Sequence, residues 1–315
     1  MNTLPANTIA AESGLLPARR RLTWARAGRA AVPYLLLLPV LAAIGAVLGY
    51  PVGYLINLSF QRYGLPELIQ HSGKWVGLDN FSSVLHDSVF WDTLKRTIIF
   101  TFANVALTMG LGTLIALLLV RVSSVLRVAL MAGLVLVWSM PAVVAVQVWY
   151  WMTNFENGVV NYIFGLGQYD WYSSDFKELA MVTALIVWAA IPFVVITVYA
   201  GLAQVPHELV EAAEIDGARG WRIFRDVTFP ILKPIFLILT SLSIIWDFAV
   251  FTQPFLLLNS RPNTDYYLMS IYLYEKSIGL HEYGLGSAIA IVMVLILLVL
   301  SGFYVRQMVK QGETR

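Results

Sequence analysis

Six long apolar stretches divide the chain, and each is long enough to cross a membrane as a helix. They run approximately over residues 33–60, 94–120, 128–152, 179–203, 231–258 and 285–308. A membrane-spanning helix needs about 20 mostly apolar residues. None of the stretches alternates in the way that a membrane β-barrel strand does. The pattern therefore predicts an all-α, polytopic membrane protein with six transmembrane helices.

The composition supports this reading and excludes several other classes of protein. Hydrophobic residues make up 58% of the 315 residues and charged residues only 13%, against about 25% charged in a soluble domain. A disordered chain would need the opposite balance. The chain has no cysteine and its four histidines show no metal-ligand spacing. We therefore expect no disulfide, no thiolate chemistry and no metal site.

Lysine and arginine are distributed unevenly between the loops. Of the 21, 14 fall in segments 1–32, 121–127, 204–233 and 306–315, and 7 on the opposite side, where the outer loops also hold 11 acidic residues. Basic residues accumulate in cytoplasmic loops. Both termini are therefore predicted to be cytoplasmic, with tails at 1–32 and 310–315 around a transmembrane permease domain at 33–309. The first apolar run is too long for a cleaved signal peptide.

The long loop 61–93 is predicted to lie on the outer side. Its residues 76–85 have apolar positions at helical spacing, which suggests a short helix at the outer interface. An ordered surface loop is the alternative.

The longest predicted cytoplasmic loop, 204–230, has the pattern of two helices joined by a turn. Pro206 suits a first helical turn, and residues 207–215 are good helix formers. Gly217 can adopt the positive φ of a helix end. Trp221 and Phe224 then lie on one side of a second helix, before Pro230 opens the fifth span. Aromatic anchors of this kind dominate interfaces, so a docking element and an amphipathic loop on the bilayer are both compatible with the pattern.

The same loop resembles the EAA loop of ABC importer permeases. Glu211-Ala212-Ala213, Asp216-Gly217-Ala218 and Val227-x-Phe229-Pro230 fit every interval of that family's pattern, with Val and Phe replacing the usual Ile and Leu. The resemblance extends from Pro33 to about Met308 and is to the carbohydrate-importing branch. It implies the type I importer permease fold, and a permease subunit that takes up a sugar or small oligosaccharide across the bacterial inner or plasma membrane.

The resemblance also implies partners and roles. The partners are a second homologous permease, two ATPase subunits and an extracytoplasmic solute-binding protein. In the loop, Glu211 would pair with a basic group of the ATPase, and Ala212 and Ala213 would pack in its cleft. Gly217 would make the turn, with Asp216 stabilising it. Trp221 and Phe224 complete the expected ATPase-coupling set.

We expect no enzymatic activity from this chain. ATP hydrolysis needs a G-x-x-x-x-G-K-[ST] phosphate loop, and the only lysine that follows a glycine, Lys74, precedes a tryptophan. ATP and magnesium would therefore be bound by the partner ATPase, and this chain would hold no cofactor. No nucleophile elbow or other catalytic signature is present.

Polar and aromatic residues inside the spans mark a candidate substrate path, because intramembrane polar groups are costly. Asp247 is the only carboxylate well inside a span, and Pro192 is expected to weaken the fourth span and open a cavity. The resemblance places a sugar site in the middle of spans four and five, where Ala190 replaces a common glycine. The candidate path residues are Gln147, Trp188, Ala190, Phe193, Trp246, Asp247, Val250 and Gln253.

Two further features of the sequence concern this prediction, one a departure from the family pattern and the other an alternative function. The family often follows span five with an L-T-x-G-G-P turn, whereas residues 257–262 lack its glycines. The alternative function, a stand-alone ion-coupled secondary transporter, would show internal inverted repeats, and none is evident.

Overall fold

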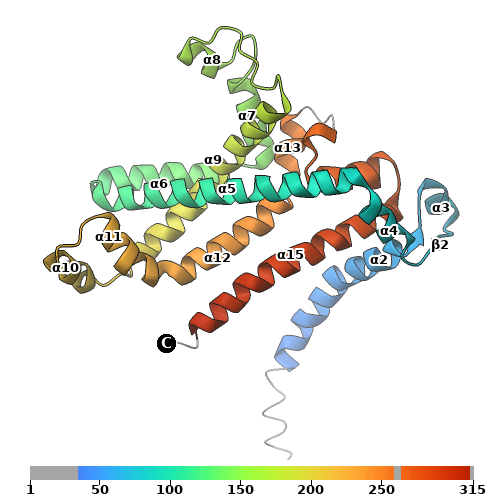
Figure 1. Ribbon diagram of the computed structural model, residues 1–315, viewed down its shortest axis with the longest axis horizontal. Coiled ribbons are helices and arrows are strands. Elements are labelled where there is room, and N and C mark those ends of the chain that lie inside the picture. The colour runs from blue at the N-terminus through green and yellow to red at the C-terminus, as the bar shows by residue number, and fades with distance from the viewer. Residues whose placement is uncertain (1–34, 259–263, 313–315) are drawn as a thin grey trace, which may run out of the picture. The chain divides into compact units, whose positions relative to one another are not determined.

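The structure is a computed structural model that describes residues 35–258 and 264–312. The chain divides into two compact units, Met1–Tyr54 and Leu55–Arg315. Nearly all the described elements are helices (Figure 1). The predicted tail at 1–32 and the altered turn at 259–262 lie outside the described residues.

The described part of the first unit is helical and apolar. The helical run Leu35–Ser59 is long and apolar enough to cross a membrane, and it includes the π-helical turn η1 (Gly45–Gly49) and helix α2 (Tyr50–Ser59). Its side chains at 35–54 are all exposed. The predicted first span is therefore present as a helix whose apolar surface is not buried within its own unit.

A small hairpin and two short helices follow. Strand β1 (Gln61–Arg62) pairs antiparallel with β2 (Lys74–Trp75), and α3 (Leu65–Gln70) lies between them in the sequence. Helix α4 (Asp79–His86) confirms the short helix predicted from the spacing at 76–85. The hairpin and α3 were not predicted.

Four long helices form the body of the second unit. They are α5 (Ser88–Arg121), α9 (Asp175–Leu202), the helical run Trp221–Phe248 and α15 (Tyr283–Gly312). Helix α5 packs against α9 and α12. Gly112 makes the approach to α9 possible, since an added Cβ would lie 2.6 Å from Val194 Cγ1. Pro192 is buried within α9, and the helix is continuous on both sides of it. The weakening expected at this proline therefore does not break the helix.

The third predicted span is not one straight helix. Helices α6 (Ser124–Ser139) and α7 (Ala142–Met152) meet at an angle of 104°. Met140 is extended, with φ −71° and ψ 127°, because the residue before a proline is disfavoured in the helical region. Pro141 therefore ends one helix and begins another. Counting this bent pair as one span gives the six predicted spans among the described residues.

The fifth predicted span, 231–258, is also interrupted. Helix α12 (Phe229–Phe248) ends before a break at 249–251, and α13 (Thr252–Leu257) follows. Pro254 has no N–H to donate to the carbonyl of Val250. That carbonyl instead accepts a hydrogen bond from the Ser270 hydroxyl. Helix α13 packs against α7 and α9, so the second halves of both interrupted spans contact each other.

The remaining elements are short. They are α8 (Val159–Phe164), α10 (His207–Ile215), α11 (Trp221–Ile223), the π-helical η2 (Phe224–Thr228), the 3₁₀ turn η3 (Thr264–Tyr266), α14 (Met269–Tyr274) and the π-helical η4 (Glu275–Gly279).

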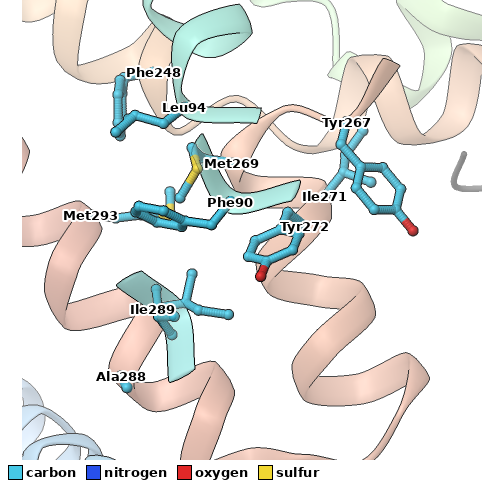
Figure 2. Close-up of a cluster of buried hydrophobic side chains, with 11 residues drawn as sticks. Phe90, Leu94, Phe248, Tyr267, Met269, Ile271, Tyr272, Ala288, Ile289 and Met293 are labelled. Carbon is cyan, nitrogen blue, oxygen red and sulfur yellow. The ribbon is translucent and has the colours of Figure 1, made fainter. Parts of the chain in front are cut away.

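One of three apolar clusters joins α4, α5, α12, α14 and α15 (Figure 2). In it Leu94 lies beside Phe248, and the rings of Phe90 and Tyr272 have centroids 6.4 Å apart. The other two clusters join α5 to α7, α9 and α13, and α5 to α9 and α12. Helix α5 contributes to all three and is the central element of the fold.

Hydrogen bonds and an ion pair attach the Ser88 end of α5 to segment 264–276. Asp87 caps α5 at the N–H of Val89, accepts a 2.7 Å hydrogen bond from the Tyr272 hydroxyl and lies 3.4 Å from Lys276 Nζ. Burial opposes ionisation of Asp87, but these donors outweigh it and lower its pKa. Burial, followed by the bond to this carboxylate, raises the pKa of Tyr272.

Two further residues of α5 extend this attachment. Arg96 donates to the carbonyls of Thr264 and Tyr267, and the Thr97 hydroxyl accepts from the N–H of Met269. Segment 264–276 is thus held to α5 at two places, at Asp87 just before the helix and at Arg96 and Thr97 within it.

Candidate functional site: the EAA loop and the membrane aromatic chain

The EAA loop, residues 204–230, contains the predicted helix and turn. Helix α10 ends in a Schellman motif, in which Ala218 N–H donates to Ala213 and Gly217 N–H donates to Glu214. Gly217 has φ +79°, a conformation that costs other residues about 1–2 kcal/mol. The turn is therefore built by the backbone. The Asp216 side chain, expected to stabilise it, forms no hydrogen bond with the described residues.

Helix α10, the first helix of the EAA loop, exposes most of the residues that were predicted to contact the ATPase. Glu211 and Ala212 are exposed and Ala213 is half-buried. Leu209 and Ile215 are exposed as well. Small and apolar residues that the chain itself leaves uncovered are what a docking helix requires.

The second helix of the loop is continuous with the fifth span. Elements α11, η2 and α12 form a single run from Trp221 to Phe248, so Pro230 lies near the start of α12 and does not open a separate helix. The rings of Trp221 and Phe224 are 5.5 Å apart, and Trp221 is 71% exposed. The aromatic pair and the fifth span therefore belong to one continuous helical run.

Inside the spans, three aromatic rings from different helices form a continuous chain. Phe193 of α9 stacks on Trp138 of α6, with centroids 5.9 Å apart and an interplanar angle of 17°. Phe193 also contacts Trp246 of α12 at 5.4 Å. Trp138 is 55% exposed and Trp246 51%. We call these three residues the membrane aromatic chain.

Sequence reasoning predicted two members of this chain and missed the third. Trp138 lies in an apolar run that reads as an ordinary span, and its sequence gives no polar signal. Its position three residues before Pro141 was the available clue, because a helix that ends inside a membrane usually lines a cavity or lies against protein.

The other predicted path residues lie on α7, α9 and α13 and in the break after α12. The ring centroids of Trp188 and Trp149 of α7 are 6.0 Å apart, and both rings pack against the apolar cluster that joins α5 to α7, α9 and α13. Gln147 is exposed on α7, and Ala190 and Gln253 are half-buried. Val250 lies in the break after α12, with its carbonyl engaged by Ser270. Of these residues, Ala190 lies one helical turn before Phe193 on α9, whereas Trp188 contacts α7.

Asp247 follows Trp246 in α12 but is buried, so it is not part of the exposed surface of the membrane aromatic chain. It is 7% exposed and forms no hydrogen bond or ion pair with the described residues. Successive residues of a helix differ by about 100° in direction, so Trp246 and Asp247 face different neighbours. Ser243 lies one turn earlier on the same buried face.

A second row of buried polar residues lies on α5. Asn104 is fully buried; its amide donates to Phe100, but its side-chain oxygen has no partner among the described residues. The hydroxyls of Thr93, Thr101, Thr108 and Thr113 are likewise buried without partners there. Buried polar groups are usually hydrogen-bonded, which marks α5 as a helix with unsatisfied polar groups inside the bundle.

The candidate spans, two of them interrupted, and the exposed helical loop between two of them describe a polytopic membrane protein. The chain belongs to the family described as "Binding-protein-dependent transport system inner membrane component", whose profile matches residues 108–312, more than half of the chain. It is the membrane-spanning permease subunit of an ABC importer. It is not an enzyme, since ATP hydrolysis in these importers belongs to a separate subunit.

Similar proteins cover nearly the whole chain. The diacetylchitobiose uptake system permease protein DasB of Streptomyces coelicolor is 42% identical, over 98% of this chain and 96% of its own length. The trehalose/maltose transport system permease protein MalF of Thermococcus litoralis is 30% identical, over 87% and 92%. A crystal structure of a bacterial ABC transporter that imports alginate has a chain with the same fold, with TM-score 0.76, 21% identity, and coverage of 91% and 98%.

Proposed function

We propose that this permease carries a sugar or small oligosaccharide, and that the membrane aromatic chain lines the path. The contacting rings of Trp138, Phe193 and Trp246, with both indoles exposed, are the observation that carries the proposal. Aromatic faces pack against the C–H surfaces of sugars, and indole N–H groups can donate to hydroxyls. The named relatives that transport diacetylchitobiose and trehalose or maltose support the same substrate class.

Asp247 contributes to the same path in this proposal. An ionised carboxylate accepts hydrogen bonds and cannot donate them, and sugar hydroxyls are donors. A buried carboxylate without donors is costly, so we assign to Asp247 a donor that arrives with the substrate or the partner permease. Trp188, Ala190, Val250, Gln253 and Gln147 remain predicted path residues around it.

The proposed assembly contains a second homologous permease, two ATPase subunits and an extracytoplasmic solute-binding protein. The EAA loop would enter the ATPase through Glu211, Ala212 and Ala213, with both chain termini on the same, cytoplasmic side. ATP and magnesium would bind the ATPase subunits. The family assignment leaves no role for the alternative of a stand-alone ion-coupled transporter.

The test is uptake of labelled mono- and disaccharides by cells that express the complete importer. Trp246→Ala should reduce uptake of the transported sugar by about tenfold or more, the effect of losing about 1.4 kcal/mol of contact, and Trp246→Phe should restore part of it. Trp151→Ala is the matched control, because Trp151 is also exposed but lies outside the chain. Equal uptake by Trp246→Ala and wild type would refute the aromatic path.

Two further variants separate the roles of Asp247. Asp247→Asn should preserve assembly and lower uptake, whereas Asp247→Leu should lose uptake almost completely. A structural role toward the partner permease predicts loss of the partner on purification instead. Normal assembly and normal uptake by Asp247→Leu would exclude both roles.

A further inference from the structure

A cavity of about 1020 Å³ lies between the EAA loop and the Arg121 end of α5. One wall comes from the last turns of α5 and α9, and the other from the EAA loop and the first turns of the run that begins at Trp221. Its lining is mainly apolar, including Leu114, Leu117, Phe224, Phe229 and Phe236. An apolar cavity at the end of membrane helices is open to molecules that partition into the bilayer.

Two arginines also line this cavity, and both come from the α5–α6 junction. Arg127 donates to the carbonyls of Leu119, Val120 and Val122 and lies over the Tyr199 ring at 5.7 Å. Its guanidinium is therefore held in place. Arg121 is exposed and makes no hydrogen bond or ion pair with the described residues, so its donors are available to a ligand.

The opposite wall supplies a different chemistry. Trp221, which is suited to a membrane interface, and Glu214 line the cavity from the EAA loop, together with His207. A carboxylate there disfavours a second phosphate but accepts hydrogen bonds from hydroxyls. The site thus combines arginine donors for one phosphate, an acceptor for a hydroxyl-bearing headgroup and an apolar space for an acyl chain.

We propose that this cavity binds one anionic glycerophospholipid of the phosphatidylglycerol type. Its phosphate would engage Arg121 and Arg127, a headgroup hydroxyl would donate to Glu214, and an acyl chain would lie along α5 toward Phe236. Basic pockets between membrane helices recognise anionic headgroups in this way. Because its two walls are the span ends and the EAA loop, the bound lipid would stabilise one separation of the two.

Native mass spectrometry of the purified importer tests this, in mixed micelles that contain phosphatidylglycerol and phosphatidylcholine with identical acyl chains. Phosphatidylglycerol should be enriched over phosphatidylcholine at one site per copy of this chain. Arg121→Gln should lower that enrichment about fivefold, the effect of one basic residue. Arg306→Gln removes a charge near the end of α15, outside the cavity, and should leave the enrichment unchanged.

A second variant fills the cavity without touching its charges. Gly110 lines it and has no heavy atom within 4 Å of an added Cβ, so Gly110→Phe should fold and should lower the occupancy of both lipids. Arg127 is left intact because it caps α5.

Three outcomes would overturn the proposal. The first is the absence of phosphatidylglycerol enrichment, or an enrichment that neither variant lowers. The second is competition by glycerol phosphate as effective as by the lipid, which would indicate a soluble anion. The third is loss of an importer subunit from Gly110→Phe with lipid retention unchanged, which would indicate that a protein partner fills the cavity.

Discussion

At the Ser88 end of α5, polar side chains form hydrogen bonds and an ion pair with segment 264–276. At its Arg121 end, the EAA loop leaves several of its side chains exposed. Asp87, Arg96 and Thr97 each bond to segment 264–276. The EAA loop, by contrast, is shaped by the backbone bonds of its turn and exposes Leu209 and Trp221. The first region is completed within the chain, whereas the second leaves its side chains exposed, as the proposed docking to a partner requires. Substitutions should therefore impair stability at the first and transport at the second.

The largest expected effect is that of Gly217→Pro on transport. Proline fixes φ near −65° and cannot adopt the observed +79°. Opening the turn should reduce uptake by more than about tenfold, since such a backbone conflict costs about 3 kcal/mol. Uptake and the ATPase subunit retained on the purified complex should both fall.

Gly165→Pro is the control for this variant. Gly165 also ends a helix, at φ +63° with open space around it, but lies in the loop between α8 and α9. It should retain most of the uptake. Equal losses from both variants would mean that any strained turn impairs transport, and the contrast between the two regions would fail.

Next in size is the loss of stability from Asp87→Ala. The substitution removes a helix cap and leaves Tyr272 and Lys276 without their acceptor, at a cost of about 2–4 kcal/mol. Denaturant unfolding of the purified protein, followed by tryptophan fluorescence, would measure it. Asp79→Ala is the control, because the Asp79 side chain is exposed in the first turn of α4. A change no larger than that of the control would show that the Asp87 bonds do not stabilise the fold.

A smaller effect should distinguish two faces of α5 near its Arg121 end. Gly112→Ala would push against Val194 of α9 and should destabilise the protein by about 1–3 kcal/mol. Gly110→Ala meets open space and should stabilise it by about 0.5–1 kcal/mol, because alanine is the better helix former. The same unfolding assay compares them. A similar loss of stability from both substitutions would contradict the assignment of Gly112 to a packed face of α5 and of Gly110 to an open one.

The smallest effect is the pH dependence of the Asp87 contribution. The pKa of this carboxyl is lower in the folded state than its ordinary value of 3.8. Its stabilising contribution is therefore complete above that value and is lost as the pH falls through the folded-state pKa. The difference in unfolding free energy between wild type and Asp87→Asn should stay constant from about pH 8 to 5 and decrease below about pH 4. A difference that already changes above pH 5 would exclude Asp87 as its source.

Hydropathy and turn chemistry were enough to predict much of this molecule. The positions of the spans, helix α4, helix α10 and the positive φ of Gly217 follow from residue type and spacing alone, because each depends on neighbours within a few residues. The continuity of the third and fifth spans was wrongly predicted. A hydropathy window averages over Pro141, and it cannot see that Ser270 engages the carbonyl that Pro254 leaves free.

The candidate path was the least predictable part. Whether Trp246 or Asp247 faces an open surface depends on how α5, α9 and α15 surround α12, and these contacts are distant in the sequence. Trp138 meets Phe193 because α6 packs against α9, a contact between segments that are distant in the sequence. Residues that become neighbours through tertiary packing leave no local pattern to detect.

The uninterrupted run from Trp221 to Phe248 also fixes a rotational phase between the EAA loop and the membrane aromatic chain. Its 28 residues correspond to a helix of about 42 Å. One residue inserted near Thr240 would turn everything beyond it by about 100°, so that Trp246 would point in the direction that Asp247 has now and Asp247 in that of Phe248. Seven inserted residues would restore the phase to within about 20° while lengthening the helix by about 10 Å. A rotation of the EAA loop about this helix would therefore turn the side chains of the proposed path, as well as shift them along it.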